Sequence, residues 1–226
     1  MNLLDNIVWH ALSGPQQRFS SGTATARRYA TGFSPMVAFA DCQQPDFEAL
    51  APWCESGENF YCADWTGPPP PGWCVDVETT MHRMVWDGGL PEEPAPPFTS
   101  RPLQPKDADA ALALALLTKP GPFGPRTIEL GEYLGCFDAA GALIAMAGER
   151  MHAPGLREVS GVCTHPGHQG KGLARKLMLQ LLRRQMQRGE QPFLHVMASN
   201  TGALGLYERM GFRTYKVCPV RVVTRR

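Results

Sequence analysis

The chain has 226 residues, a formal net charge of +1, 43% hydrophobic residues and 19% charged residues. This composition indicates a globular protein with one large or two small domains. The balanced charge gives no general attraction to nucleic acid or membranes, and no apolar run is long enough to span a bilayer. The segment Met1–Asp5 lacks the basic and apolar regions of a signal peptide. We therefore expect a cytoplasmic protein without nucleic-acid or membrane partners.

The elements before residue 98 predict a small α+β region with no recognisable catalytic motif. The proline-rich segment 90–97 predicts an extended connector, because prolines disrupt helix and sheet interiors. Apolar patterning predicts the elements in front of it. These are a helix near 3–12, a strand at 35–40, a short helix at 46–52, and strands at 59–63 and 74–80, the last extending toward Trp86.

The elements after the connector alternate between strands and helices. The sequence predicts a strand at 98–103, a helix at 107–117, a hairpin from 133–137 and 143–148, a strand at 157–164, a helix from about 170 to 188, a strand at 192–197 and a helix opening at Asn200. Gly189 and Gly211 are predicted to end the last two helices. We therefore divide the chain into an N-terminal region, residues 1–97, and a C-terminal region, residues 98–226.

Two motifs follow each other in the C-terminal region. Gln169–Ala174 fits the pattern Gln/Arg-x-x-Gly-x-Gly/Ala at a helix entry, where small residues and free N–H groups favour a pyrophosphate. The segment 200–212 fits Asn-x-x-Ala-x-x-Leu-Tyr-x-x-x-Gly-Phe. Together they resemble the GNAT superfamily of acyl-CoA-dependent N-acyltransferases, and segment 158–166 looks closest to the glycine N-acyltransferase-like branch. The resemblance implies an α/β (α+β) GNAT fold with a mixed, twisted central sheet, preceded by the smaller α+β region.

The resemblance also implies acetyl-CoA, or another short acyl-CoA, as co-substrate. The backbone of strand 158–164 would pair with the pantetheine arm and polarise the thioester carbonyl. The glycine-rich loop would grip the pyrophosphate through backbone N–H groups. The implied cofactor-binding residues are Val162, Cys163, Thr164, Gln169, Gly170, Lys171, Gly172, Leu173, Ala174, Arg175, Asn200, Ala203 and Tyr207.

Tyr207 is the candidate general acid, since tyrosine at this motif position protonates the departing thiolate in the family. The alternative is a tyrosine that packs only through its ring. Glu158 and His195 are candidate general bases, and either can instead be a hydrogen-bonded structural residue. Cys163 invites an acyl-cysteine intermediate, but no His–carboxylate pair accompanies it in sequence, so direct attack is favoured.

Seven cysteines at irregular spacing, with no Cys-x-x-Cys pair, favour reduced thiols. His165 and His168 stand near Cys163, but no second ligand pair accompanies them, so we expect a polar loop and no required metal.

The sequence thus predicts acetyl or short-acyl transfer to a primary amine of a small molecule. A non-catalytic acyl-CoA sensor and an acetyltransferase for protein N-termini or lysines stay open as alternatives, and so do monomer and homodimer. The N-terminal region, 1–97, is expected to wall the acceptor site, with stability as its alternative role. Exposed-prone side chains could line a cleft there, namely those of Tyr61, Trp65, His82 and Trp86.

Overall fold

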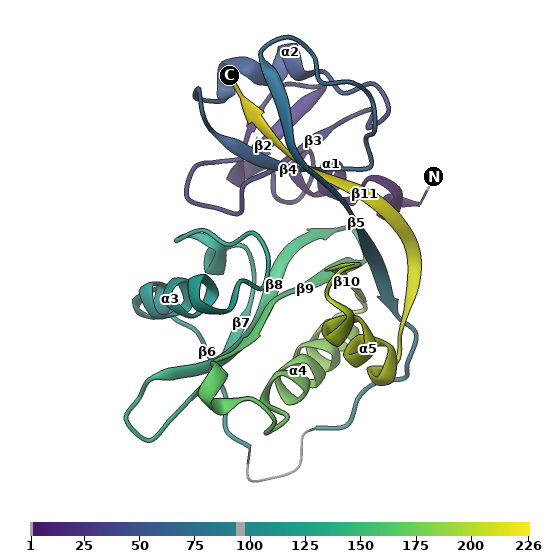
Figure 1. Ribbon diagram of the computed structural model, residues 1–226. Coiled ribbons are helices and arrows are strands. Elements are labelled where there is room, and N and C mark those ends of the chain that lie inside the picture. The colour runs from purple at the N-terminus through teal and green to yellow at the C-terminus, as the bar shows by residue number, and fades with distance from the viewer. Residues whose placement is uncertain (1, 94–97) are drawn as a thin grey trace.

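The computed structural model describes residues 2–93 and 98–226. Residues 94–97 of the expected connector lie outside the described residues, and residues 90–93 form neither helix nor strand. The described strands form one 11-stranded sheet in the order β1-β2-β3-β4-β11-β5-β10-β9-β8-β7-β6. The fold is therefore the mixed α+β architecture that the motifs predicted (Figure 1).

The elements before residue 94 form the upper portion of the molecule in Figure 1. A 3₁₀ turn at Leu3–Asn6 opens the chain, because Asn2 caps it by accepting from the Leu4 N–H. The regular elements are α1 (Ile7–Leu12), β1 (Ser20–Gly22), β2 (Ala26–Tyr29), β3 (Met36–Phe39), α2 (Phe47–Leu50), β4 (Asn59–Ala63) and β5 (Trp73–Trp86). The short β1 and β2 were not predicted, since β1 is Ser-Ser-Gly and the charged Arg27 and Arg28 interrupt the apolar pattern of β2.

The elements after residue 97 form the lower portion and return to the upper one (Figure 1). They are β6 (Arg101–Pro102), α3 (Ala108–Thr118), β7 (Tyr133–Phe137), β8 (Leu143–Ala153), β9 (Leu156–Thr164), α4 (Leu173–Gln187), β10 (Gln191–Met197), α5 (Thr201–Met210) and β11 (Phe212–Arg225). Helix α4 begins three residues later than expected, because Gly170 and Gly172 take left-handed φ angles of 77° and 71°.

Two long strands join the N-terminal and C-terminal regions. Strand β5 pairs with β11 along its whole length, and β11 also pairs with β4. On its other edge β5 pairs with β10 in the C-terminal region. The sheet therefore runs across the expected division at residue 97, and Figure 1 shows β5 and β11 passing together between the upper and lower portions.

Two of the described strand pairs are parallel, β3–β4 and β9–β10, and they lie on opposite sides of the β5–β11 ribbon. Each is connected through a helix, α2 in the first case and α4 in the second. Strands β9 and β10 pair only from Leu156 to Glu158 on β9, and beyond that point no pairing joins them. This divergence opens the middle of the sheet.

The lower portion of the sheet carries helices on both faces. Along β8, Ala145 and Ala147 pack into the core that contains α4 and α5, whereas Met146 packs against α3. This alternation is the period of a strand buried on both faces. The same holds on β9, where Val162 packs on the α4 side and Cys163 on the α3 side.

A second core lies between the two regions of the chain. It packs α1 residues such as Ile7 and Leu12 against Met151 of β8, Phe193 of β10 and Val85 of β5. The buried side chain of Gln16 donates to the carbonyl oxygens of Leu130 and Arg150. The N-terminal region therefore anchors the strand that carries Arg150. Within the described residues, no helix has the length and apolarity needed to cross a membrane.

Candidate active site

A cavity of about 280 Å³ opens where β9 and β10 diverge. One side is formed by the β9 segment 159–162 and the β10 segment 195–197, and α5 contributes Ala203 and Tyr207, with Asn200 at its N-cap. The other side is formed by the loop 119–122 and by residues of β3, β4, β5 and β11. The cavity therefore lies between the motif strands and the region that precedes residue 94.

Tyr207 combines burial with an unused hydroxyl. Its ring packs in the core at 9% exposure, and the hydroxyl makes no hydrogen bond to any described residue. Burial, reinforced by the nearby Cys163, raises the pKa of Tyr207 to about 12. The phenol is therefore protonated at neutral pH, which is the state a proton donor requires. Asn200 holds the start of α5, because its Oδ1 accepts from the Ala203 N–H at 3.2 Å.

The glycine-rich loop is open and built from backbone. Gly172 precedes α4 as its N-cap without a side-chain cap, and the first bond of the helix runs from the Lys176 N–H to the Gly172 carbonyl. The N–H groups of the first turn consequently have no partner within the helix. A Cβ added at Gly170 or Gly172 would meet nothing within 4 Å, so the positive φ angles and not crowding require glycine.

Strand β9 is irregular beside the cavity. Its register with β8 shifts between Ser160 and Cys163, and Gly161 has a φ angle of 61°. A Cβ on Gly161 would approach the Tyr133 ring to 2.9 Å, so a side chain is excluded on two grounds. The irregularity re-aims the backbone of the segment predicted to meet the thioester.

Glu158 and Arg150 form a buried ion pair beneath the cavity. Arg150 donates from Nε at 3.0 Å and from Nη2 at 2.6 Å to the two carboxylate oxygens of Glu158, which is fully buried. Burial acts to raise the pKa of Glu158, but the Arg150 guanidinium and the His195 hydrogen bond outweigh it and hold the pKa at about 2. Glu158 is therefore an anion with its oxygens engaged at neutral pH.

His195 is held from both ring nitrogens. Its Nδ1 lies 2.8 Å from Glu158 Oε1, and Arg83 Nε donates to its Nε2 at 2.9 Å. Since Nε2 accepts this bond, the neutral ring carries its proton on Nδ1 and donates it to Glu158. Burial lowers the pKa of His195 below its ordinary value. The imidazole is thus neutral, with its basic lone pair directed at Arg83.

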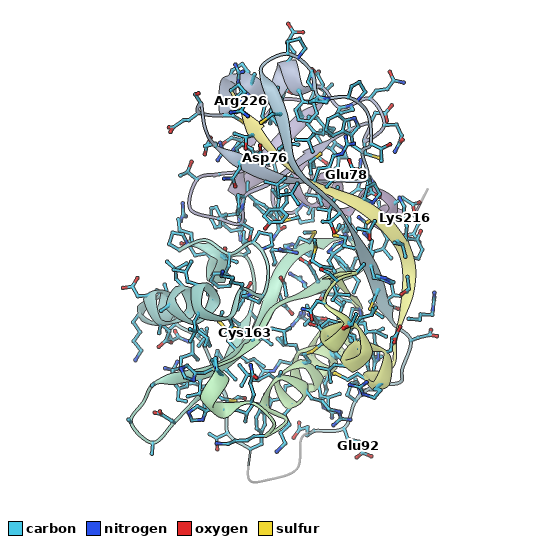
Figure 2. All side chains as sticks on the ribbon, in the orientation of Figure 1. Asp76, Glu78, Glu92, Cys163, Lys216 and Arg226 are labelled. Atoms are coloured by element: carbon cyan, nitrogen blue, oxygen red, sulfur yellow. The ribbon has the colours of Figure 1, made fainter. Side chains whose placement is uncertain are left out.

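The chain of polar contacts continues across the sheet. Lys216, Arg83 and His195 are successive cross-strand neighbours on β11, β5 and β10. Asp64 joins them by accepting from Arg83 Nη2 at 2.8 Å and from Lys216 Nζ at 2.6 Å. Arg83 is fully buried, and Figure 2 places Lys216 at the outer side of β11. The series runs from the surface to the cavity.

Cys163 is turned away from this chemistry. It packs against Ala111, Leu114 and Ala115 of α3, and Figure 2 shows it between β9 and that helix. Burial raises the pKa of its thiol to about 11. The thiol is therefore protonated at neutral pH and lies in the core.

The structure brings together only some of the predicted residues. Val162, His195, Asn200, Ala203 and Tyr207 line the cavity. Glu158 lies behind it and reaches it only through its bonds to Arg150 and His195. The residues that do not line it are Cys163, Thr164 and the loop Gln169, Gly170, Lys171, Gly172, Leu173, Ala174 and Arg175, which enters α4 at the far end of β9.

The N-terminal region contributes different residues from those expected. Tyr61 lines the cavity, but Trp65 and Trp86 are core residues. His82 pairs with Thr214 through a 3.0 Å contact from its Nδ1. These three side chains do not line this cavity. The cavity wall carries other residues of this region instead, namely Met36, Ala63 and Met81.

Arg150 and Arg83 are the site residues that sequence reasoning missed. The hairpin was expected to end at Gly148, and an arginine beyond it suggested no buried position. β8 in fact extends to Ala153 and includes Arg150. The signal for this longer strand was the apolar Met151, which follows the charged pair Glu149-Arg150 shortly before the next predicted strand.

Comparison with known proteins identifies the class. The family model described as FR47-like protein matches residues 133–220. Over the whole length of both chains, the structure is similar to that of a GNAT-family protein from Novosphingobium aromaticivorans, with 34% identity and a TM-score of 0.87. The chain therefore belongs to the GNAT family of acetyltransferases, whose co-substrate is acetyl-CoA.

Two further proteins are similar to this chain, one in structure and one in sequence. A GCN5-related N-acetyltransferase from Kribbella flavida shares the fold, with 18% identity, a TM-score of 0.61, and coverage of 96% of this chain and 94% of that one. A mycothiol acetyltransferase from Streptomyces scabiei is 33% identical over 154 residues, which cover 60% of this chain. The match spans 50% of that curated relative's length. The glycine N-acyltransferase-like branch is not among these relatives.

Proposed function

We propose that this GNAT acetyltransferase transfers the acetyl group of acetyl-CoA to the primary amine of a small molecule by direct attack. The observation that carries the proposal is the cavity that both the diverging motif strand and Tyr207 line. A pocket bounded by the region before residue 94 suits a small acceptor. The mycothiol acetyltransferase relative supports the same reaction class.

The proposed cofactor site uses the open backbone of the C-terminal region. The first-turn N–H groups after Gly172 would hold the pyrophosphate. The edge of β9 that faces β10, which β10 leaves unpaired beyond Glu158, would meet the pantetheine arm near Val162. Lys171 and Arg175 add positive charge beside the phosphates. No metal is needed for this chemistry.

In the proposed reaction the amine nitrogen attacks the thioester carbonyl carbon and gives a tetrahedral intermediate. A backbone N–H of the irregular β9 segment at Gly161–Val162 would stabilise the oxyanion. The carbon–sulfur bond then breaks, and the thiolate takes the proton of the Tyr207 hydroxyl. The resulting phenolate regains a proton from water, which also receives the proton of the amine. The raised pKa of Tyr207 supports this role because the phenol keeps its proton until the thiolate forms.

The amine must also lose a proton. His195 directs its lone pair at Arg83, and the depressed pKa of Glu158 makes it a weak base. We therefore propose that both residues position the cavity wall and that the amine's proton leaves to water. The nearby cations Arg150 and Lys119 favour this by lowering the pKa of a bound amine.

The test is an amine screen in which release of free CoA thiol from acetyl-CoA is followed, with mass spectrometry of the product. Acetylation of one or more small primary amines is expected. Binding of acetyl-CoA without thiol release for any amine would instead support a sensor. Acetylation confined to peptide N-termini or lysines would support a protein acetyltransferase.

A further inference from the structure

The cavity lining is charged with one sign. Among its described lining residues there is no aspartate or glutamate, whereas Arg150 and Lys119 both contribute cations. Most of the remaining wall is apolar, including Met36, Met81 and Val220. A positive group on an otherwise apolar wall is an arrangement that orients an anionic ligand group.

The guanidinium of Arg150 has one end free. Nε and Nη2 are engaged by Glu158, but Nη1 makes no hydrogen bond to a described residue. The residue is only 6% exposed and borders the cavity. The side chain therefore borders the cavity with one donor that the described residues leave unused.

The same guanidinium is held rigidly in place. Glu158 fixes it from behind and is itself fixed by His195, which Arg83 holds in turn. The Arg150 backbone is fixed by Gln16, which donates to its carbonyl at 2.8 Å. A donor that is already ordered loses little conformational entropy when a ligand binds.

We propose that Arg150 binds a carboxylate of the acceptor, so that the acceptor is an amine that also carries a carboxylate, as amino acids do. This inference rests on the proposed function and names its substrate class. Arg150 lies at the wall anchored by the N-terminal region of the chain, away from the glycine-rich loop expected to hold the cofactor phosphates. Its partner is therefore an anion of the acceptor.

The experiment compares amino acids with their own carboxamides, which differ only in that charge. Pairs such as glycine and glycinamide, β-alanine and β-alaninamide, and phenylalanine and phenylalaninamide are assayed by thiol release. Each rate is divided by the fraction of free amine at the assay pH. The N-acetylated forms of both series are also titrated calorimetrically into CoA-saturated protein, which measures recognition without turnover.

We expect the carboxylate member of at least one pair to be preferred by about tenfold or more, the size of a charge-assisted hydrogen bond. Arg150→Gln should abolish this preference and leave acetyl-CoA affinity unchanged. Because that variant leaves the buried Glu158 unpaired, the double variant Arg150→Gln/Glu158→Gln is made beside it. The matched control is Arg28→Gln, since Arg28 is as buried as Arg150, forms a two-pronged pair with the partly exposed Glu58, and does not line the cavity.

Equal kcat/KM and equal binding within every pair, or binding of neither member, would overturn the inference. So would a preference that survives in a folded variant lacking Arg150, or a loss of acetyl-CoA affinity, which would assign the arginine to a cofactor phosphate. Equal loss of kcat for acids and amides in the variant would assign it to the oxyanion. Thiol release with uncharged amines alone would leave the proposed function standing and reject only this inference.

Discussion

The proposed site has two ends that are built in different ways: a cofactor end, the glycine-rich loop 169–175 outside the cavity, and an acceptor end, the cavity itself. At the cofactor end, a local glycine-rich segment presents backbone N–H groups. The space around Gly172 is open, since a Cβ added there would have no neighbour within 4 Å. At the acceptor end, side chains from β5, β8, β9 and β10 meet in a buried polar series. The first end is local in sequence and open to solvent, whereas the second is nonlocal and preorganised. In the proposed function, the cofactor is therefore bound by a segment that a motif can encode, and the acceptor by a cluster that tertiary packing creates.

The largest expected effect is at the cofactor end. Gly172→Glu should raise the Kd for acetyl-CoA by about a hundredfold or more, because it places a side chain and a negative charge at the helix entry. Calorimetric titration measures this. The matched control is Gly189→Glu at the other end of the same helix, where φ is also positive at 74° and the surrounding space is equally open. Equal affinity in the two folded variants would contradict the loop assignment.

The next effect concerns Tyr207, the proposed general acid, which lies on the cavity wall. Tyr207→Phe should lower kcat by about a hundredfold or more and leave acetyl-CoA affinity unchanged, since only a proton donor is removed. Steady-state kinetics with the best amine of the screen measures it. Tyr215→Phe serves as the control, because Tyr215 bonds Asp5 away from the cavity. If kcat falls less than about threefold, another group protonates the thiolate.

At the acceptor end, the ionised Glu158 carboxylate should make the stability of the protein depend on pH. The pKa of Glu158 is depressed from 4.5 to about 2 in the folded protein. The contribution of ionised Glu158 to the free energy of unfolding is therefore complete above about pH 4.5 and is lost as the pH falls through about 2. The loss amounts to about 3 kcal/mol of the free energy of unfolding, at about 1.4 kcal/mol for each pKa unit.

Denaturant unfolding between about pH 7 and about pH 2 measures this, with Arg150→Gln/Glu158→Gln as the comparison. The double variant should show a shallower acid slope than the wild type over that window. A variant with an unchanged slope would mean that other carboxylates, such as Asp107 with its depressed pKa of about 2, account for the acid sensitivity.

The smallest expected effect is at Cys163. Cys163→Ala should change kcat less than about threefold, because the thiol packs against α3 and its pKa is raised to about 11. Steady-state kinetics and intact-protein mass spectrometry after mixing with acetyl-CoA measure it. An acetylated Cys163 that forms and decays at the rate of turnover would replace direct attack with an acyl-enzyme route.

The contrast between the two ends explains what the sequence could predict. The order of β7 to α5 and the positions of Gly172, Asn200 and Tyr207 follow from local patterns and spacing. The long pairing of β5 with β11 could not be predicted, because it joins residues more than 120 positions apart and no local signal records such a partner. The same reason hides Arg83, whose contacts include Leu4, Asp64 and His195.

Burial is the basis on which we propose roles for the residues whose function the sequence left open. Glu158 and His195 have the right chemical groups for a base, but their function depends on which atoms surround them. Only the folded chain shows that Arg83 occupies the His195 lone pair and that Arg150 holds the Glu158 carboxylate. For Cys163, the folded chain argues against a chemical role. Its position in the alternation of side chains along β9 places it on the α3 side of the sheet, away from the cavity.

A crystal structure with acetyl-CoA bound would show whether one cavity holds both the thioester and the acceptor. We predict the pyrophosphate at the N–H groups after Gly172, the pantetheine along the edge of β9 that faces β10, and the thioester sulfur within hydrogen-bond reach of the Tyr207 hydroxyl. The acetyl group should then point toward Arg150. Acetyl-CoA bound elsewhere, or with its thioester outside the cavity between β9 and β10, would contradict the shared cavity.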